Sequence, residues 1–244
     1  MALLPYSEEQ VLDRLRFENP WWVTGTVEEY YTSMQRRLYF DLFMPLVTET
    51  DIRRAVVLMG PRRVGKTVML FHAVQHLLEN EVNPLKVAFV SIETPIYNKI
   101  GLEQLFGFCR KATKQESPKG WYVFFDEIQY LKDWEVHLKS LVDSYPYTRF
   151  VVSGSVAAAL RLKSNESGAG RFTDFMLPPL TFNEFIHLKQ LNRLITETNP
   201  DWQGSLTKFY GTNNIHELNR HFLDYINYGG YPEVGGNSKL MVLH

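Results

Sequence analysis

The segment GPRRVGKT, residues 60–67, constrains the fold of this 244-residue chain more than any other part of the sequence. It follows the apolar run RAVVLM at 54–59 and leads into KTVMLFHAVQHLLEN at 66–80, where apolar residues recur at helical spacing. A glycine-rich loop between a strand and a helix directs backbone N–H groups toward an anionic group. The order strand, glycine loop and helix therefore predicts an α/β fold with a phosphate-binding loop.

The loop matches the full pattern G-x-x-x-x-G-K-[ST], the motif called the P-loop. The residues predicted to contact the phosphates are Gly60, Pro61, Arg62, Arg63, Val64, Gly65, Lys66 and Thr67. The lysine neutralises β- and γ-phosphate oxygens, and the threonine hydroxyl is a ligand for Mg²⁺. The two arginines occupy positions that tolerate most residues, so they either contact phosphates or face solvent.

Two adjacent carboxylates close another apolar run, WYVFFDE at 121–127. Because parallel sheets bind ligands at the carboxyl ends of their strands, we expect Asp126 beside the P-loop, where it would hold Mg²⁺. Glu127, one residue further, can orient a water molecule and accept its proton. The alternative is that both acids are solvated caps at a strand end. Together with the P-loop, the pair favours hydrolysis of a nucleoside triphosphate over transfer of its phosphate.

The sequence does not favour a guanine nucleotide. A GTPase would carry an Asn-Lys-x-Asp motif after its magnesium aspartate, and the only Asn-Lys pair, Asn98-Lys99, precedes Asp126. Ile100 and Gly101 follow that pair. We therefore expect the bound nucleotide to be ATP.

Strand and helix patterns alternate through the middle of the chain. Four further β-branched or aromatic runs predict strands, and helical patterns fit between them: strands at 86–92, 121–127, 149–155 and 173–180, and helices at 101–113 and 134–145. Strands that are apolar on both faces and alternate with helices indicate a parallel sheet covered on each side. We place this core at residues 51–180.

Helical patterns flank the core on both sides. Residues 1–50 are predicted to form an N-terminal helical segment, with capping boxes at Ser7–Gln10 and Thr26–Glu29 and the turn NPWW between two helices. The strand signal fades near Leu180. Residues 181–244 are therefore predicted to form a separate helical part.

Composition places few restrictions on partners. Lys and Arg total 26 against 27 for Asp and Glu, so the charge balance requires neither nucleic acid nor membrane. The single cysteine, Cys109, can form no internal disulfide, which favours a reducing compartment. No window approaches the ~20 apolar residues of a membrane span, and the start of the chain has no signal-peptide pattern. We expect a cytoplasmic protein.

As a set, these motifs resemble the prokaryotic AAA-type ATPases related to the STAND and archaeal ATPase group of P-loop NTPases. The resemblance covers nearly the whole chain, through NPWW, GPRRVGKT, FFDEIQYLKDWEVHLKSLVD, FVVSGS, GAGRFTDFMLPPLTFNEF and GGYPEV. It implies a P-loop NTPase parallel sheet flanked by helices, with ATP and Mg²⁺ bound and a C-terminal helical lid at 181–244. Such relatives usually continue into another domain, so a further effector domain is expected in the native protein.

The resemblance also implies a sensor at the end of the strand at 149–155. Ser153, with Ser155 as the competing candidate, takes the position of a polar side chain that contacts the γ-phosphate or the attacking water. Read from the residues alone, Ser155 is equally a helix N-cap for the segment VAAALRL that follows.

Two further positions gain roles from the resemblance. Arg171 takes the position of an arginine finger, which a neighbouring subunit can supply; the alternative is a structural ion pair with an acid such as Asp174 or Glu184. Gly229 and Pro232 of GGYP take the position where the lid approaches the nucleotide, although a Gly-Gly-x-Pro run is also an ordinary helix terminator.

The expected function is Mg²⁺-dependent ATP binding and hydrolysis by a module that drives or gates an attached effector or partner. The expected catalytic residues are Lys66, Glu127, Ser153 and Arg171, and the expected metal ligands are Thr67 and Asp126. The alternative is a nucleotide-gated switch or scaffold with slow turnover, which needs only a few kcal/mol of differential affinity between two states. A finger acting in trans would require a homo-oligomer, a protein or DNA partner stays open, and no membrane partner is expected.

Overall fold

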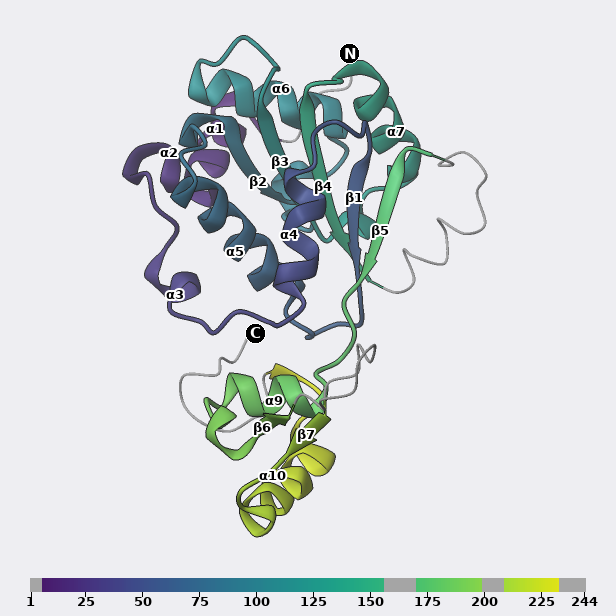
Figure 1. Ribbon diagram of the computed structural model, residues 1–244. Coiled ribbons are helices and arrows are strands. Elements are labelled where there is room, and N and C mark those ends of the chain that lie inside the picture. Colours follow the sequence, from purple (N-terminus) through teal and green to yellow (C-terminus); the bar gives the residue numbers. More distant parts are fainter. Residues whose placement is uncertain (1–5, 156–169, 199–208, 233–244) are drawn as a thin grey trace. The chain divides into compact units, whose positions relative to one another are not determined.

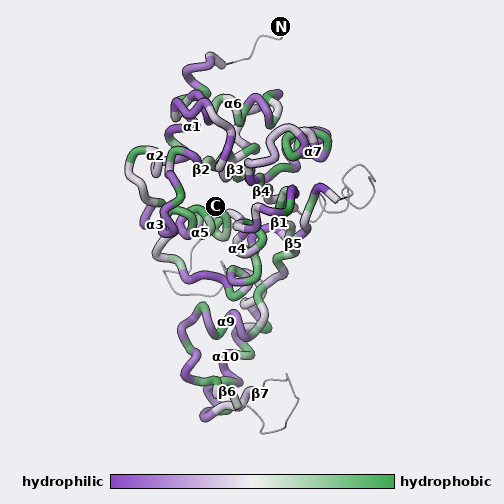
Figure 2. Tube along the Cα trace, turned by 45° about the horizontal axis from the view of Figure 1, so that its top comes forward, coloured by the Kyte–Doolittle hydropathy of each residue, from purple (hydrophilic) through white to green (hydrophobic). Residues whose placement is uncertain are grey.

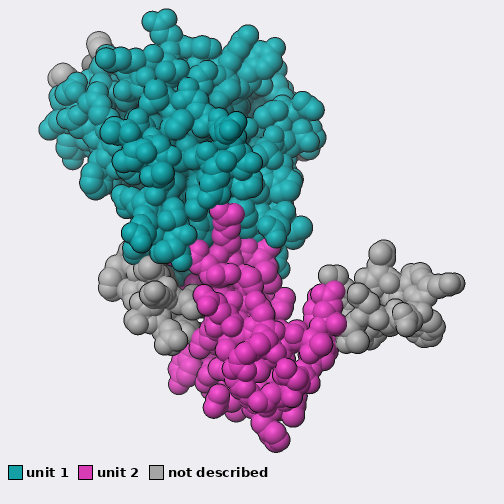
Figure 3. Space-filling model, turned by 60° about the vertical axis from the view of Figure 1, so that its left-hand side comes forward, with its two compact units in different colours: residues 1–33, 39–177 teal, residues 34–38, 178–244 magenta. Residues whose placement is uncertain are grey.

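The computed structural model describes residues 6–155, 170–198 and 209–232, and the chain divides into two compact units (Figure 3). Unit 1 contains Met1–Ser33 and Tyr39–Leu177, and unit 2 contains Met34–Leu38 and Pro178–His244. The sheet and most of the residues before it thus form one unit, and the residues from Pro178 onward belong to the other.

Unit 1 is built on a five-stranded sheet with the strand order β2-β3-β4-β1-β5 (Figure 1). The strands are β1 (Ala55–Met59), β2 (Val87–Ser91), β3 (Trp121–Asp126), β4 (Thr148–Gly154) and β5 (Phe172–Met176). Each neighbouring pair is parallel, and Val151 of β4 lies opposite Val56 on one side and Phe124 on the other. The α/β fold with a parallel sheet is confirmed, and each of the five strands lies within or overlaps a predicted apolar run. The last run, at 173–180, was predicted too long, because β5 ends at Met176, shortly before Pro178 and Pro179.

Helices cover both faces of this sheet. The helices that pack on it are α1 (Glu8–Glu18), α4 (Phe40–Thr48), α5 (Lys66–Glu79), α6 (Leu102–Thr113) and α7 (Trp134–Ser144). There are 3₁₀ turns at Pro84–Lys86, Pro95–Tyr97 and Ile128–Tyr130. Hydrophobic residues predominate along α5 in Figure 2. Because both faces are covered, every residue of β1 is buried, which explains a continuous rather than an alternating apolar run.

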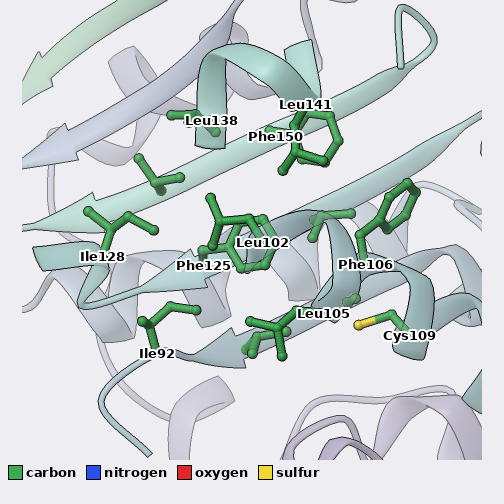
Figure 4. Close-up of a cluster of buried hydrophobic side chains, with 14 of the residues drawn as sticks. Ile92, Leu102, Leu105, Phe106, Cys109, Phe125, Ile128, Leu138, Leu141 and Phe150 are labelled. Atoms are coloured by element: carbon green, nitrogen blue, oxygen red, sulfur yellow. The ribbon is translucent and has the colours of Figure 1, made fainter. Parts of the chain in front are cut away.

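The two faces have separate hydrophobic cores. On one face, α4 and α5 pack on alternate strand residues such as Leu58 and Phe124. On the other face, Leu105 of α6 and Leu138 of α7 belong to the same cluster as Phe125 of β3 and Phe150 of β4 (Figure 4). The alternation along each strand therefore assigns successive residues to opposite cores.

The N-terminal helices are shorter and more numerous than predicted. They are α1 (Glu8–Glu18), α2 (Trp21–Thr24) and α3 (Glu29–Thr32), followed by α4. Ser7 and Gln10 form both hydrogen bonds of the predicted capping box. The NPWW segment is not a simple turn, because Pro20 is the N-cap of α2, a position before a helix that suits its fixed φ.

The predicted capping box at Thr26–Glu29 is wrong. Helix α3 begins at Glu29 with Glu28 as its N-cap, and no side chain caps it. The Thr26 hydroxyl lies 3.5 Å from the Thr24 hydroxyl, which also accepts from the Thr26 N–H. The Thr26 hydroxyl therefore makes a hydrogen bond within the turn after α2 in place of the predicted capping bond to α3.

Side chains of the NPWW segment cover the outer edge of β2. The buried Asn19 amide accepts from Phe89 N–H (2.6 Å) and donates to the Phe89 carbonyl (2.8 Å), as a neighbouring strand would. The indole N–H groups of Trp21 and Trp22 both donate to the Val87 carbonyl. An uncovered edge would be available for pairing with another chain, so these side chains both close the edge and hold α1 against the sheet.

Unit 2 combines helices with a short strand pair. Its described elements are α9 (Phe182–Leu188), a 3₁₀ turn (Asn192–Leu194), β6 (Thr196–Thr198), β7 (Phe209–Gly211) and α10 (Ile215–Tyr228). The antiparallel β6–β7 pair was not predicted, since strands of three residues carry too little periodicity to detect. Arg37 forms a bidentate ion pair with the buried Glu184, at 2.7 Å for both contacts. In the described parts of both units, no helix has the length and apolar character to cross a membrane.

Candidate functional site

The carboxyl ends of β1, β4 and β3 lie side by side at one edge of the sheet. The P-loop follows β1, Ser153 lies near the end of β4, and Asp126 ends β3. Since β4 lies between β1 and β3, Ser153 lies between the P-loop and Asp126. The strand order therefore gathers three distant segments of the sequence at one site.

The P-loop joins β1 to α5 through a left-handed turn. Gly65 is the N-cap of α5 with φ 90°, a backbone conformation in which a residue with a side chain would be strained. Helix α5 begins at Lys66, so its first N–H groups have no partner within the helix and are available to a phosphate. Arg62 and Arg63 are exposed, whereas Val64 is fully buried in the core under α5.

Lys66 is held inside the loop. It is only 4 % exposed, and its ammonium group donates to the carbonyls of Gly60 (3.2 Å) and Pro61 (2.9 Å). Burial lowers the pKa of Lys66, while Glu127 and Asp126 raise it. A desolvated cation beside two carboxylates is placed to neutralise the phosphate oxygens of a nucleotide.

Gly60 is required by a close approach. A Cβ atom at Gly60 would overlap the carbonyl oxygen of Leu177 and lie 3.2 Å from Val64 Cγ2. The Leu177 N–H in turn donates to the Met59 carbonyl (2.7 Å), so the backbone just after β5 is fixed against the end of β1. Neither backbone segment can move without disturbing the sheet.

Replacing Gly60 with alanine is expected to lower the free energy of unfolding by about 1–3 kcal/mol, because overpacking forces a backbone shift. The matched control is Gly107→Ala in α6, where a Cβ would meet no atom within 4 Å. Alanine in a helix interior should raise stability there by about 0.5–1 kcal/mol. Urea unfolding of the three proteins measures both changes, and equal stability of Gly60→Ala and the unsubstituted protein would contradict the steric account.

Asp126 is the centre of the site. It is 3 % exposed, accepts from the Thr67 hydroxyl (2.7 Å) on one carboxylate oxygen and accepts from the Ser153 hydroxyl on the other. Burial raises its pKa to about 6, and the two hydroxyls lower it. A hydroxyl and a buried carboxylate are hard oxygen ligands, and a cation would offset the desolvation of the carboxylate, so Thr67 and Asp126 fit a bound Mg²⁺.

The raised pKa predicts how stability depends on pH without nucleotide or metal. Asp126 titrates near 3.8 when unfolded and about 6 when folded, so its contribution is complete below pH ~4 and is lost as pH rises through ~6. The loss is about 3 kcal/mol. Asp126→Asn should remove this part of the dependence of the unfolding free energy on pH, and it should raise stability at pH 8. The substitution Asp41→Asn, at an exposed position, should do neither. Urea unfolding in EDTA at pH 5 and pH 8, between which roughly half of this loss falls, tests the expectation. An unchanged dependence of stability on pH in Asp126→Asn refutes it.

Glu127 follows Asp126 in a strained conformation. Its φ of 54° and ψ of 48° are left-handed, which is uncommon for a residue with a side chain and is found at functional sites. The Glu127 N–H donates to the Ser153 hydroxyl (3.2 Å), so one serine contacts both acids of the pair. The left-handed conformation of Glu127 thus turns the chain away from the direction of β3, at the end of the sheet where the P-loop lies.

Gln129 was missed by the reasoning from sequence. Its amide N–H donates to the Glu127 carboxylate, and its amide oxygen accepts from the Ser155 N–H (3.1 Å). Gln129 therefore holds the carboxylate of Glu127 and ties it to the end of β4. Ser155 reaches the site only through its backbone in these contacts, and the segment that it was expected to cap, from residue 156, lies outside the described residues. The spacing of two residues after Glu127 was the only available signal.

Arg171 lies away from this site. Its carbonyl accepts from Ala55 N–H, so it lies beside the start of β1, while the P-loop follows the end of β1, roughly 16 Å further along the strand. Its guanidinium pairs with Asp143 (3.0 Å), not with Asp174 or Glu184 as the sequence suggested. Asp143 lies near the end of α7, and Glu184 is paired with Arg37 in unit 2.

Gly229 and Pro232 belong to unit 2. Gly229 ends α10, where its N–H donates to the Tyr225 carbonyl (2.7 Å) and a Cβ would overlap Tyr225 backbone. The neighbouring Gly230 carbonyl accepts from Leu180 N–H (3.1 Å). The GGYP turn therefore terminates a helix and ties it to the start of α9, as the structural interpretation of the sequence expected.

The site as a whole joins Lys66, Thr67, Asp126, Glu127 and Ser153 in unit 1. The profile of the AAA domain family matches residues 52–186, more than half of the chain, and this match includes all five. The chain belongs to the AAA domain family. The AAA-type part of the resemblance and the P-loop NTPase fold are thus confirmed, and the chain contains a nucleotide-binding ATPase module. The narrower grouping with STAND and archaeal ATPases stays a prediction.

Curated relatives of this AAA domain are longer proteins. The chain is 26 % identical over 178 residues to an uncharacterized protein of Haemophilus influenzae, with 73 % of this chain and 39 % of that protein covered. An uncharacterized protein of Methanocaldococcus jannaschii is 27 % identical over 178 residues, with 73 % and 35 % covered. The chain thus spans less than two-fifths of the length of these relatives.

Two solved structures are remotely similar. Aeropyrum pernix ORC1 in complex with DNA has a TM-score of 0.47 and 12 % identity, covering 70 % of this chain and 52 % of that one. The Saccharomyces cerevisiae Hsp104–ADP complex has a TM-score of 0.48 and 13 % identity, covering 67 % and 25 %. The family assignment depends on the sequence match and not on these likenesses.

Proposed function

We propose that this AAA domain hydrolyses ATP with Mg²⁺ and that the nucleotide cycle drives or gates an attached effector or a partner in the cytoplasm. The observation that carries the proposal is the hydrogen-bonded series Thr67–Asp126–Ser153 next to the buried Lys66. A phosphate cradle, a metal-binding carboxylate and a second carboxylate at the strand end are the groups that this reaction needs.

In the proposed reaction, water attacks the γ-phosphorus while the bond to the oxygen bridging the β-phosphate breaks, giving ADP and phosphate. The loop N–H groups and Lys66 hold the phosphate oxygens. Mg²⁺ held by Thr67 and Asp126 would supply positive charge at the β- and γ-phosphates. Glu127 orients the water and accepts its proton. Ser153 holds the Asp126 carboxylate and the Glu127 backbone N–H in place through its hydrogen bonds.

Arg171 is proposed to act in trans. It lies at the opposite end of the strands from its own P-loop, so its guanidinium would serve the γ-phosphate of a neighbouring copy in a homo-oligomer. Gly229 and Pro232 are proposed to bring the helical lid to the nucleotide. Their part in ending α10 is compatible with that role.

Phosphate release from ATP and from GTP, measured against protein concentration with Mg²⁺ or EDTA, tests the proposal. We expect release from ATP with Mg²⁺ only, rising more steeply than linearly with concentration. Arg171→Ala should abolish the steep part, because a trans finger contributes roughly 10³-fold or more to turnover. Repeating the assay with duplex DNA tests a DNA partner.

Asp143→Ala is the matched control for Arg171. It breaks the same exposed ion pair, whose side chains are 44 % and 43 % exposed, but keeps the guanidinium. A trans finger predicts full activity in Asp143→Ala, whereas a structural ion pair predicts that both variants behave alike. Linear kinetics unaffected by Arg171→Ala would refute the trans role without refuting hydrolysis.

A further inference from the structure

A cavity of about 680 Å³ lies at the amino ends of the strands, at the opposite edge of the sheet from the P-loop. It is lined by residues before β1, around the start of β3 and between α7 and β4, all within unit 1. Its volume lies within the range of about 300–1,000 Å³ typical of small-molecule sites. Arg149, near the start of β4, lines the cavity, and Ser153, near the end of β4, lies at the ATPase site. The two sites are therefore roughly 13 Å apart along this strand.

The charged side chains that line the cavity are mostly cationic. Among the described residues they are Arg53, Arg54, Lys119 and Arg149, against the single carboxylate of Asp51. The overall charge of the chain is −1, so this excess is a local feature rather than a consequence of composition. A concave surface with one sign of charge concentrates ions of the opposite sign.

Arg149 is the most buried of these four cations. It is 6 % exposed, and its Nη1 group donates to the carbonyls of Arg54 (2.5 Å) and Ile52 (3.3 Å). Its Nε and Nη2 groups are buried and have no hydrogen-bond partner among the described residues. Nη1 therefore fixes the guanidinium in place and leaves the opposite edge of the group unpaired.

The unpaired edge has a specific chemistry. Nε–H and Nη2–H point in parallel from the same side of the guanidinium and match two oxygens of a phosphate or carboxylate. Burial lowers the pKa of Arg149, and the nearby Tyr122 and Glu49 only partly offset this effect. A buried donor pair without an acceptor is unfavourable, so an anion that reached it would relieve that cost.

The surroundings favour a phosphate ester over a carboxylate. Arg53 and Arg54 each donate through Nε to a backbone carbonyl, of Val142 and Gly170, and these bonds hold their positive charge beside the cavity. Several cations around one anchor favour an ion with more than one negative charge. Tyr147 is 67 % exposed at the rim, with the Lys119 ammonium 5.0 Å from its ring centre, and offers an aromatic face for an organic body.

We propose that this cavity binds a small phosphate-bearing molecule, with the Nε and Nη2 edge of Arg149 anchoring its phosphate group. The site is independent of the P-loop and of ATP hydrolysis. Free phosphate and an organic phosphate monoester share this chemistry, and the two are separated by the probes below.

Titration calorimetry with inorganic phosphate and with phenyl phosphate tests the proposal. The protein carries Lys66→Ala, so that binding at the P-loop is suppressed, and sodium chloride at equal ionic strength is the blank. We expect millimolar or tighter binding, weakened roughly 10-fold or more by Arg149→Met and unchanged by the exposed Arg16→Met. Tighter binding of phenyl phosphate identifies an organic ester, and equal binding identifies free phosphate.

The proposal is overturned if neither probe binds at millimolar concentration, or if Arg149→Met binds both as tightly as its parent. Circular dichroism establishes whether Arg149→Met is folded. Should it not fold, Lys119→Ala decides, because Lys119 is exposed and its removal leaves Arg149 in place. Weakening by severalfold in Lys119→Ala supports the cavity as the binding site, and unchanged binding refutes it.

Discussion

Replacing Glu127 with glutamine is expected to lower the turnover number for ATP roughly 100-fold or more, with ATP affinity changed by less than roughly threefold. An amide has the size of the carboxylate but cannot accept the proton of the attacking water. It can still accept the hydrogen bond from Gln129, so the local structure should persist. Phosphate release and calorimetric titration of ATP measure the two quantities separately.

Glu93→Gln is the control for this substitution. Glu93 is exposed and follows β2, so it lies at the same edge of the sheet without contacting the site residues in the described structure. It should retain full turnover. Equal turnover in Glu127→Gln and the unsubstituted protein would remove Glu127 from the mechanism. ATP binding without measurable turnover in the unsubstituted protein would instead favour the nucleotide-gated switch.

Replacing Lys66 with alanine is expected to weaken ATP binding by roughly 100-fold or more. The substitution removes a desolvated cation from the position of the β- and γ-phosphates, and losing one partner of a buried charge pair costs about 3–5 kcal/mol. The fold should persist, because in the described structure the Lys66 ammonium donates hydrogen bonds only to the Gly60 and Pro61 carbonyls of its own loop. Calorimetry with Mg²⁺-ATP measures the affinity, and thermal unfolding without nucleotide checks the fold.

The substitution Arg62→Ala separates the effect of the buried Lys66 ammonium from the effect of the loop's net positive charge. Arg62 lies in the same loop but is exposed, and its positive charge is screened by solvent. It should change ATP affinity by less than roughly threefold. An equal loss in both variants would mean that the loop acts through its net charge and not through the buried ammonium.

The order of the elements in unit 1 was predictable because its signals are local. The run RAVVLM, residues 54–59, is apolar throughout and ends at a glycine, and β1 occupies Ala55–Met59. The rule that parallel sheets bind their ligands at the carboxyl ends of the strands was sufficient to place Asp126 beside Thr67. Short elements were not predictable in the same way. Helix α3 and the β6–β7 pair have too few residues to show a periodic pattern, and whether they form depends on contacts with other segments.

The sequence by itself determined the fold class, the P-loop and the pair Asp126 and Glu127, since each depends on residue types at short spacing. Only the tertiary structure decided that Ser153 contacts both acids, that Gln129 holds Glu127 and that Arg171 lies at the far end of its own strands. It also decided that Arg149, which lines a cavity, has a buried edge without a partner among the described residues. These relations join residues far apart in the chain or depend on how one turn is bent. Strand order and backbone conformation fix them, and neither is visible in the spacing of residues along the sequence.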